Sequence, residues 1–237
     1  MSAKHNLAWA VKYYYLFRSK GLLNQVISRT NIKEYEIKAF QKAANKMFIP
    51  YDEELDISPQ DDSFLDKKIW VFDKSCNDKS PLLLHYHPLV LYRYKVCKQA
   101  DAVLAHFLYG SEIIKTTILN SFRYYEKITT HDSSLSKSVF SIVASFLGLN
   151  KKAYKYFGNS AEIDMLDLNG NTKDGIHTAN MGGSYLALVF GFAGYRVNEK
   201  GVYLNPRIPT RWKGYDFSLK WHNIVIKIKV NKKTSCD

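Results

Sequence analysis

The amino-acid sequence predicts a mainly α-helical fold that is followed by a small antiparallel β module. Through the first two thirds of the chain, apolar residues recur at steps of three and four, which is typical of amphipathic helices. After Gly194 the pattern changes to alternation, which is typical of half-buried strands. Helices come first and strands last, and this order argues against a parallel sheet, which needs strands and helices in alternation.

The helical part divides into about seven segments. The first shows its pattern clearly, with Leu7, Ala10, Val11, Tyr14 and Phe17 on one face. We expect helices over residues 5–19, 33–48, 89–108, 113–125, 136–147, 151–164 and 179–193. The last segment is small and apolar on nearly every side, so it should be buried.

A long irregular segment separates the second helix from the third. Pro50 stops the second helix, and Pro59 and Pro81 punctuate the partly acidic residues 49–81. A loop of this length in a compact domain usually covers another element or carries function.

The β module begins after the last helix. Turn signals at Asn205-Pro206 and Lys213-Gly214 divide it into about three strands. In residues 224–230 Ile224, Ile226, Ile228 and Val230 alternate with Val225, Lys227 and Lys229, so one face should be buried and the other solvated. Trp212 and Trp221 could stack on a sugar, but in a short β module we expect them to form its core.

Composition excludes several classes of protein. The chain has 237 residues, of which 46% are hydrophobic, so it can bury a core in one large domain with at most a small appendage. The net charge of +12 comes from lysines spread along the whole length, without a nucleic-acid-binding motif, so we expect no nucleic-acid partner. No apolar run reaches the roughly 20 residues that cross a bilayer, and the N-terminus reads as a helix rather than a signal peptide. Cys76, Cys97 and Cys236 lack metal-type spacing, which favours reduced thiols and a cytoplasmic location.

A cluster of hydroxyls precedes the helix at 136–147. The stretch TTHDSSLSKSVF, residues 129–140, contains Ser133 and Ser134 beside a histidine and an aspartate. Such residues cap helices, and capping is the plain interpretation. A helix start with surplus donors can also hold an anion, and the sequence leaves both possibilities open.

A second cluster, LDLNGNTKDGIHTANMGGSY, leads into the last helix. It combines His177 with the pair Gly182-Gly183, and glycines near a helix start allow close approach of a ligand to the backbone. A plain tight loop is the alternative. If the two clusters converge, they could hold one oxyanion between them.

Polar residues also interrupt the apolar third segment. Lys98 and Gln99 are expected within the helix at 89–108, where they need polar partners or must extend to the surface. Glu126 stands just before the hydroxyl cluster. His85 and His87 could begin a metal site, but spacing places no third ligand near them.

These stretches resemble glycoside hydrolase family 65, which contains the maltose, trehalose and kojibiose phosphorylases. LLLHYHPLVLYRYKVCKQADAVLA, YYEKITTHDSSLS and GNTKDGIHTANMGGSYLALVFGFAG look like successive C-terminal motifs of that family. PYDEELDISPQDDSFLDKKIW and LNPRIPTRWKGYDFSLKW are also similar, so the resemblance runs from about Leu7 to Lys220.

The resemblance implies an architecture. The family fold is an (α/α)6 barrel with a small β domain, so residues 1–197 should form the C-terminal portion of the barrel and residues 198–237 the β domain. About seven helices would leave that barrel incomplete. The resemblance also implies a homodimer for the intact family, and we expect no membrane partner.

The resemblance also implies a chemistry. Family phosphorylases use inorganic phosphate, without a further cofactor, to cleave an α-glucosidic bond with inversion and release β-glucose 1-phosphate. One carboxylic acid protonates the leaving oxygen, and phosphate replaces the catalytic base of an inverting hydrolase. The matching positions assign phosphate binding to Ser133, Ser134, His177, Gly182 and Gly183. Lys98, Gln99 and Glu126 match the family positions that hold the glucosyl unit.

One part of the family pattern does not occur in this sequence. The general acid is a Glu in a GPDEY-like motif, and neither that motif nor the NNAYTN-like helix start is present. Three interpretations follow: a fragment that is inactive alone, a subunit whose separately encoded N-terminal half supplies the acid, or a non-catalytic sugar- or phosphate-binding helical protein. The sequence leaves open which glucose disaccharide is cleaved, and whether the chain itself is an enzyme.

Overall fold

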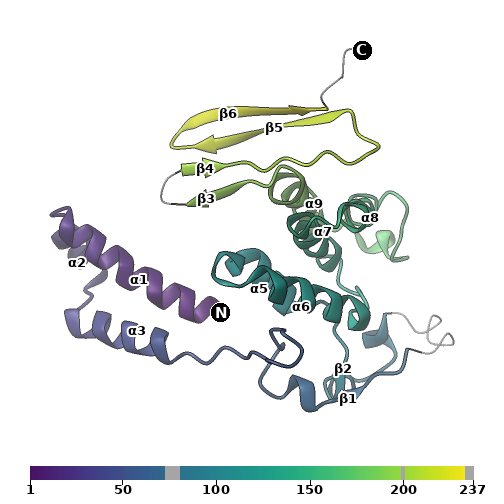
Figure 1. Ribbon diagram of the computed structural model, residues 1–237, viewed down its shortest axis with the longest axis horizontal. Coiled ribbons are helices and arrows are strands. Elements are labelled where there is room, and N and C mark those ends of the chain that lie inside the picture. Colours follow the sequence, from purple (N-terminus) through teal and green to yellow (C-terminus); the bar gives the residue numbers. More distant parts are fainter. Residues whose placement is uncertain (73–80, 199–200, 233–237) are drawn as a thin grey trace. The chain divides into compact units, whose positions relative to one another are not determined.

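The computed structural model describes residues 1–72, 81–198 and 201–232, and within them the chain is mainly helical (Figure 1). It divides into two compact units, Met1–Tyr51 and Asp52–Asp237. The described residues contain nine α-helices and, at the C-terminal end, short antiparallel strands. Four of the helices share one hydrophobic core. The predicted fold class is therefore confirmed. Cys97 is a free, buried cysteine, whereas Cys76 and Cys236 lie outside the described residues.

The first unit is a group of three helices. It consists of α1 (Ser2–Ser19), α2 (Leu23–Thr30) and α3 (Glu34–Lys46), and α2 was not predicted. The helices α1 and α3 lie side by side (Figure 1) because Val11 and Tyr14 pack against Ile37. α3 begins where the backbone N–H of Lys33 donates to the Glu36 carboxylate at 2.7 Å, which satisfies one of the free donors at a helix start.

The second unit opens with the predicted irregular segment. Its described part contains a 3₁₀ turn (Phe64–Asp66) and the two-residue strand β1 (Lys68–Ile69). Ile57 and Phe64 are buried, so this segment covers part of the core. It is also fixed by polar contacts: Asn120 donates to Asp56 at 3.0 Å, and the hydroxyl of Tyr125 donates to the carbonyl of Ser58 at 2.9 Å.

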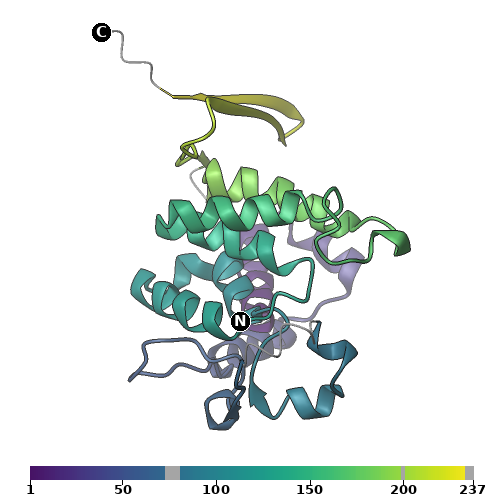
Figure 2. The same cartoon turned by 90° about the vertical axis from the view of Figure 1, so that its right-hand side faces the viewer.

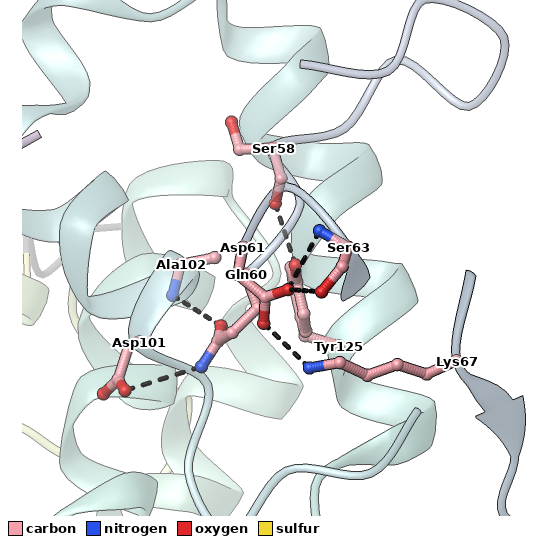
Figure 3. A network of polar contacts seen from close by, with 8 residues as sticks. All are labelled: Ser58, Gln60, Asp61, Ser63, Lys67, Asp101, Ala102 and Tyr125. Atoms are coloured by element: carbon pink, nitrogen blue, oxygen red, sulfur yellow. Dashed lines mark hydrogen bonds and ion pairs between the residues drawn. The ribbon is translucent and has the colours of Figure 1, made fainter. Parts of the chain in front are cut away.

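Figure 3 shows how the same segment is joined to the start of α5 (Asp101–Tyr109). The Gln60 side-chain oxygen accepts from the backbone N–H of Ala102 at 3.1 Å, and its Nε2 donates to Asp101 at 3.5 Å. A neighbouring carboxylate, Asp61, accepts from the Lys67 ammonium at 2.8 Å. Gln60 therefore caps a helix that lies 41 residues further along the chain.

The predicted helix at 89–108 is wrong over its first half. Only α4 (Pro88–Leu91) and α5 are helical, and β2 (Tyr94–Lys95) between them pairs with β1 in parallel, over two residues each. The backbone N–H of Cys97 donates to the carbonyl of Ile128 at 2.9 Å, and the N–H of Thr130 donates back to Cys97 at 2.9 Å. These long-range bonds replace helical ones, so Lys98 and Gln99 lie in a bend before α5 and not in a helix.

The core of the second unit forms between four helices. They are α5, α6 (Lys115–Ile128), α7 (Ser136–Leu147) and α8 (Asn150–Ala161), and Figure 1 shows α7 beside α8. Phe122, Tyr125 and Phe140 are among the buried side chains at its centre. Gly148 ends α7 with φ of 84°, a conformation that favours glycine over residues with a β-carbon.

The last helical segment is buried over only half of its length. α9 (Thr178–Leu186) continues as a π-helical turn over Ala187–Phe192. The π-helical turn is buried as predicted, but Met181, Tyr185 and Leu186 of α9 are exposed. The expectation of complete burial was therefore wrong for α9, where the apolar composition does not coincide with a packed face.

The stretch from Gly201 onward contains the expected three strands, and a further short strand precedes them, so the described strands form two antiparallel pairs. β3 (Arg196–Asn198) pairs with β4 (Gly201–Tyr203), and β5 (Gly214–Trp221) pairs with β6 (Ile224–Asn231), both antiparallel. His222 and Asn223 connect β5 to β6 with positive φ at both positions, as a tight hairpin turn requires. In Figure 2 the β5–β6 hairpin lies over the C-terminal helices, and Phe217 packs there against Val189 and Ala193.

Trp212 is partly buried and packs against the helical core of the second unit, whereas the sequence analysis expected it in the core of the β module. Its ring lies against Phe157, Phe192 and Tyr215 with centroid distances of 5.3, 5.1 and 5.9 Å. Trp221 is half-buried at the end of β5, beside His222. Across the described residues, no helix combines the length and the apolar character needed to span a bilayer.

Candidate functional site

The two clusters that the sequence singles out line one cavity in the second unit. Its volume is about 380 Å³, and it lies where α7 and α9 begin. The residues that line it are Lys98, Asp132, Ser133, Ser134, Leu135, Asn169, Asn171, Ile176, His177, Thr178, Ala179 and Asn180. Lys98, Ser133, Ser134 and His177, which were named from the sequence, are thus brought together.

Two helix N-termini face this cavity. Ser133 and Ser134 precede Leu135, the N-cap residue of α7, and Thr178, Ala179 and Asn180 are the first three residues of α9. Several of the first N–H groups already have partners, since Ser136 N–H donates to the carbonyl of Ser133, Thr178 N–H to that of Ile176 and Asn180 N–H to that of His177. The helix dipole still adds partial positive charge at each helix start. The arrangement therefore suits a negatively charged ligand.

The side chains at the cavity add further donors. Within the described residues, neither the Lys98 ammonium nor the hydroxyls of Ser133 and Ser134 have a hydrogen-bond or ion-pair partner. By contrast, the Ser138 hydroxyl is already used, because it donates to the carbonyl of Leu135 at 3.0 Å. Lys98 is the only lysine or arginine among the described lining residues, so it supplies the fixed positive charge of the cavity.

His177 is held at the cavity by an aspartate that the sequence analysis did not single out. Asp164 Oδ1 lies 2.5 Å from His177 Nδ1, and Asp164 Oδ2 accepts from the backbone N–H of His177 at 2.9 Å. The hydrogen bond from the His177 side chain lowers the pKa of Asp164 below its ordinary value. On the other side of the ring, Asn171 Nδ2 lies 3.4 Å from His177 Nε2.

His131 belongs to the first cluster, but its side chain contacts the start of α7. Its backbone has φ of 59°, and its Nδ1 lies 2.8 Å from the hydroxyl of Ser136, the first residue of α7. The ring packs against Phe140 and Tyr156, and burial lowers the pKa of His131 to about 4. His131 is therefore neutral at physiological pH, which suits a structural side chain.

Asp132 connects the cavity to the segment before α4. Its Oδ2 accepts from the backbone N–H of Leu82 at 2.8 Å, over 50 residues of sequence. Of the cluster's polar side chains, those of His131 and Asp132 therefore anchor structure, whereas Ser133 and Ser134 are available to a ligand.

Gln99 and Glu126 do not line this cavity. Gln99 donates to Asp101 Oδ1 at 3.2 Å and lines a small neighbouring cavity of about 60 Å³, which shares Leu135 with the larger one. Glu126 instead accepts from the hydroxyl of Tyr156 at 3.1 Å and pairs with Lys152, both on α8.

Gly182 and Gly183 lie in the middle of α9, away from the lining residues of the cavity. They are its fifth and sixth residues, so their N–H groups belong to the helical ladder and are not free donors. A β-carbon on Gly183 would lie 2.5 Å from Ser138 Oγ, so this glycine lets α9 approach α7 closely. The expectation that the pair lends N–H groups to a ligand does not fit this geometry.

Sequence reasoning missed Asp132, Asp164, Asn169, Asn171 and Thr178. All five stand in or beside quoted motifs, but carboxylates and amides are common in loops, and their spacing predicts no contact. His87, by contrast, caps α4, because its Nδ1 accepts from the N–H of Leu89 at 3.2 Å. No group of three or more His, Cys, Asp or Glu suited to a metal ion occurs in the described part of the chain.

Comparison with known proteins identifies the family. Residues 1–186 match the model of the "Glycosyl hydrolase family 65 central catalytic domain", and residues 195–235 match that of the family's C-terminal domain. The alpha,alpha-trehalose phosphorylase of Geobacillus stearothermophilus is 50% identical over 98% of this chain, and that of Thermoanaerobacter brockii is 46% identical over 88%.

More distant relatives agree. The maltose phosphorylase of Bacillus subtilis is 31% identical over 95% of the chain. A solved structure named "Putative kojibiose phosphorylase from human microbiome" superposes with a TM-score of 0.78 over 89% of this chain, at 30% identity. The chain covers 30%, 27% and 30% of the three curated relatives and 29% of the solved one. Its helices are therefore part of an (α/α)6 barrel, and the chain belongs to glycosyl hydrolase family 65.

Proposed function

We propose that these 237 residues are the phosphate- and glucosyl-binding part of an inverting disaccharide phosphorylase. The observation that carries the proposal is the cavity at the starts of α7 and α9. There an unpaired lysine, two unpaired hydroxyls and a histidine meet two helix N-termini, within the described residues. Such a set of donors suits inorganic phosphate, which is the co-substrate of a phosphorylase and needs no cofactor beside it.

The donors of the cavity would hold phosphate as the nucleophile. In the proposed reaction, a phosphate oxygen attacks the anomeric carbon of the glucosyl unit while the bond from that carbon to the bridging oxygen breaks. An acid delivers a proton to the leaving oxygen, and the products are β-glucose 1-phosphate and the second sugar. Lys98 and the serine hydroxyls would orient phosphate for in-line attack and balance its charge.

The acid is the part of this chemistry that the 237 residues do not supply, because the GPDEY-like motif does not occur in them. We propose that another part of the catalytic domain provides it. Residues 1–197 would then form one portion of the barrel wall and residues 198–237 its β domain. Without the acid, the 237 residues alone should release no glucose 1-phosphate.

Trehalose is the disaccharide to test first. The two trehalose phosphorylases are 50% and 46% identical to this chain, whereas the maltose phosphorylase is 31% identical. Since the chain covers only 30% or less of these relatives, maltose and kojibiose belong in the same assay.

The test combines this chain with a polypeptide that supplies the remaining part of the catalytic domain. Phosphate-dependent release of β-glucose 1-phosphate from trehalose is expected from the pair and from neither piece alone. Turnover by the 237-residue chain alone would contradict the proposal that these residues lack the general acid. A folded pair that is inactive on all three disaccharides would contradict the proposed phosphorylase activity.

A non-catalytic sugar- or phosphate-binding protein is the second candidate, since the cavity needs no acid in order to bind. Saturable phosphate binding by this chain, without turnover when the remaining part of the catalytic domain is added, would favour the binding protein.

A further inference from the structure

Asp164 meets His177 through two contacts at once. One carboxylate oxygen accepts from the backbone N–H of His177 at 2.9 Å, and the other lies 2.5 Å from Nδ1 of its ring. The two residues are 13 positions apart, with Asp164 in the turns that follow α8 and His177 directly before α9. The carboxylate thus fixes both the backbone and the ring of the residue at the start of α9.

The chemistry of this contact determines the tautomer of the ring. An ionised carboxylate has no proton to donate, so the proton between the two groups belongs to Nδ1. The pKa of Asp164 is lowered by the hydrogen bonds from His177, which keeps the carboxylate ionised at neutral pH. Nε2 then carries the lone pair, and it can accept from Asn171 Nδ2, which lies 3.4 Å away.

From this geometry we infer that Asp164 is a positioning residue, which holds His177 as the Nδ1–H tautomer with Nε2 available to a phosphate ion in the cavity. The inference rests on the proposed function for the identity of the ligand. In the neutral ring, Nε2 accepts from the hydroxyl of a protonated phosphate, which would replace the 3.4 Å contact from Asn171 Nδ2. In the protonated ring, Nε2–H donates to a phosphate oxygen while Asp164 balances the charge.

A second feature of the cavity is consistent with this role. Asn171 Oδ1 is buried, and it has no hydrogen-bond partner among the described residues. An acceptor left unpaired beside Nε2 could be satisfied by a ligand hydroxyl, since buried polar atoms normally have partners. Asn171 and His177 would then contact the same ligand.

The first experiment needs no variant. A long-range proton–nitrogen correlation spectrum of the 15N-labelled 237-residue chain reports which ring nitrogen of each of its seven histidines carries the proton. The signals of His177 are assigned by their loss in His177→Gln. We expect the Nδ1–H pattern for His177; an Nε2–H pattern would overturn the inference.

Variants then test the carboxylate itself. In Asp164→Asn the new side chain carries its own donor, so the Nε2–H form becomes accessible, and we expect a changed nitrogen pattern and phosphate binding weakened about tenfold. Asp167→Asn is the matched control, because Asp167 lies in the same turns and accepts from Thr172 N–H at 3.1 Å without contacting His177. It should leave the His177 signals and phosphate affinity unchanged.

The outcomes separate this inference from the proposed function. If Asp164→Asn folds like the parent and leaves the His177 nitrogen pattern unchanged, the positioning role is wrong even if phosphate binds. If the tautomer is as expected but inorganic phosphate does not perturb His177 in the parent chain, the phosphate site is wrong, and with it the role of Asp164 toward that ligand.

Discussion

The hydroxyl of Ser138 on α7 occupies the space that a β-carbon on Gly183 of α9 would need. The distance would be 2.5 Å to Ser138 Oγ and 3.0 Å to Ser138 Cβ. The hydroxyl could rotate away, but Cβ is fixed to the backbone of α7. The Gly183 position therefore sets how closely α9 lies on α7, and with it the distance between the two helix starts at the cavity.

Gly183→Ala should destabilise the fold by about 1–3 kcal/mol, because the two helices must separate to admit a methyl group. Gly182→Ala is the matched control: nothing lies within 4 Å of its added β-carbon, and alanine favours a helix by about 1 kcal/mol over glycine. Urea denaturation of both variants measures the difference. Equal stability of the two would contradict the close contact.

The second prediction concerns Ser133 and Ser134. Removing either hydroxyl should weaken phosphate binding about fivefold, which corresponds to about 1 kcal/mol, because each can donate one hydrogen bond to the ion. Stability should change little, since neither hydroxyl has a partner within the described residues.

Calorimetric titration of inorganic phosphate into Ser133→Ala and Ser134→Ala measures the effect. Ser28→Ala, whose hydroxyl donates to Gln25 on exposed α2, serves as the control. Unchanged affinity in both pocket variants would assign these serines to the start of α7 alone.

The third prediction is a fall in stability under mild acid. Burial lowers the pKa of both His106 and His131 to about 4, from an ordinary value of 6.5. Between pH 6.5 and 4 the unfolded chain binds protons that the folded chain does not. The free energy of unfolding therefore rises with pH across this window and falls as the pH is lowered, by up to about 1.4 kcal/mol per pH unit for each histidine.

Urea denaturation at pH 7.5, 6 and 5 checks this dependence. His106→Gln should remove about half of the slope, while His222→Asn, in the exposed β5–β6 turn, should leave it unchanged. The carboxylates with lowered pKa, such as Asp61, act in the same direction only at lower pH, so they do not obscure the effect. A flat profile between pH 7.5 and 5 would contradict the burial of both rings.

Local patterns predicted much of the fold. The helix at 136–147 was predicted with the same bounds as α7, because its periodic apolar face and its Gly148 terminus are both local signals. The helix at 89–108 was predicted wrongly because Cys97 pairs with Ile128 and Thr130, and no local pattern reports a partner some 30 residues away.

Some residues of the candidate site were likewise predicted from the sequence, whereas others depend on tertiary contacts. Ser133, Ser134 and His177 were named from two local clusters at helix starts, and the resemblance to a known family implied their role toward phosphate. The structure brings them to one cavity. Asp164 and Asn171 depend on how the turns after α8 fold back onto the start of α9, which is a tertiary contact. Gly183 was noticed for its lack of a side chain, but the contact with Ser138 that explains it lies on another helix.

The central claim is that this cavity holds the phosphate of a phosphorylase, and His177→Ala tests it most directly. In the enzyme assembled with the remaining part of its catalytic domain, the apparent KM is measured separately for phosphate and for trehalose. We predict that the variant raises the KM for phosphate about tenfold or more and leaves the KM for trehalose within about twofold of the parent. Equal increases in both constants would contradict the account, because they would make His177 a structural residue rather than a ligand of phosphate.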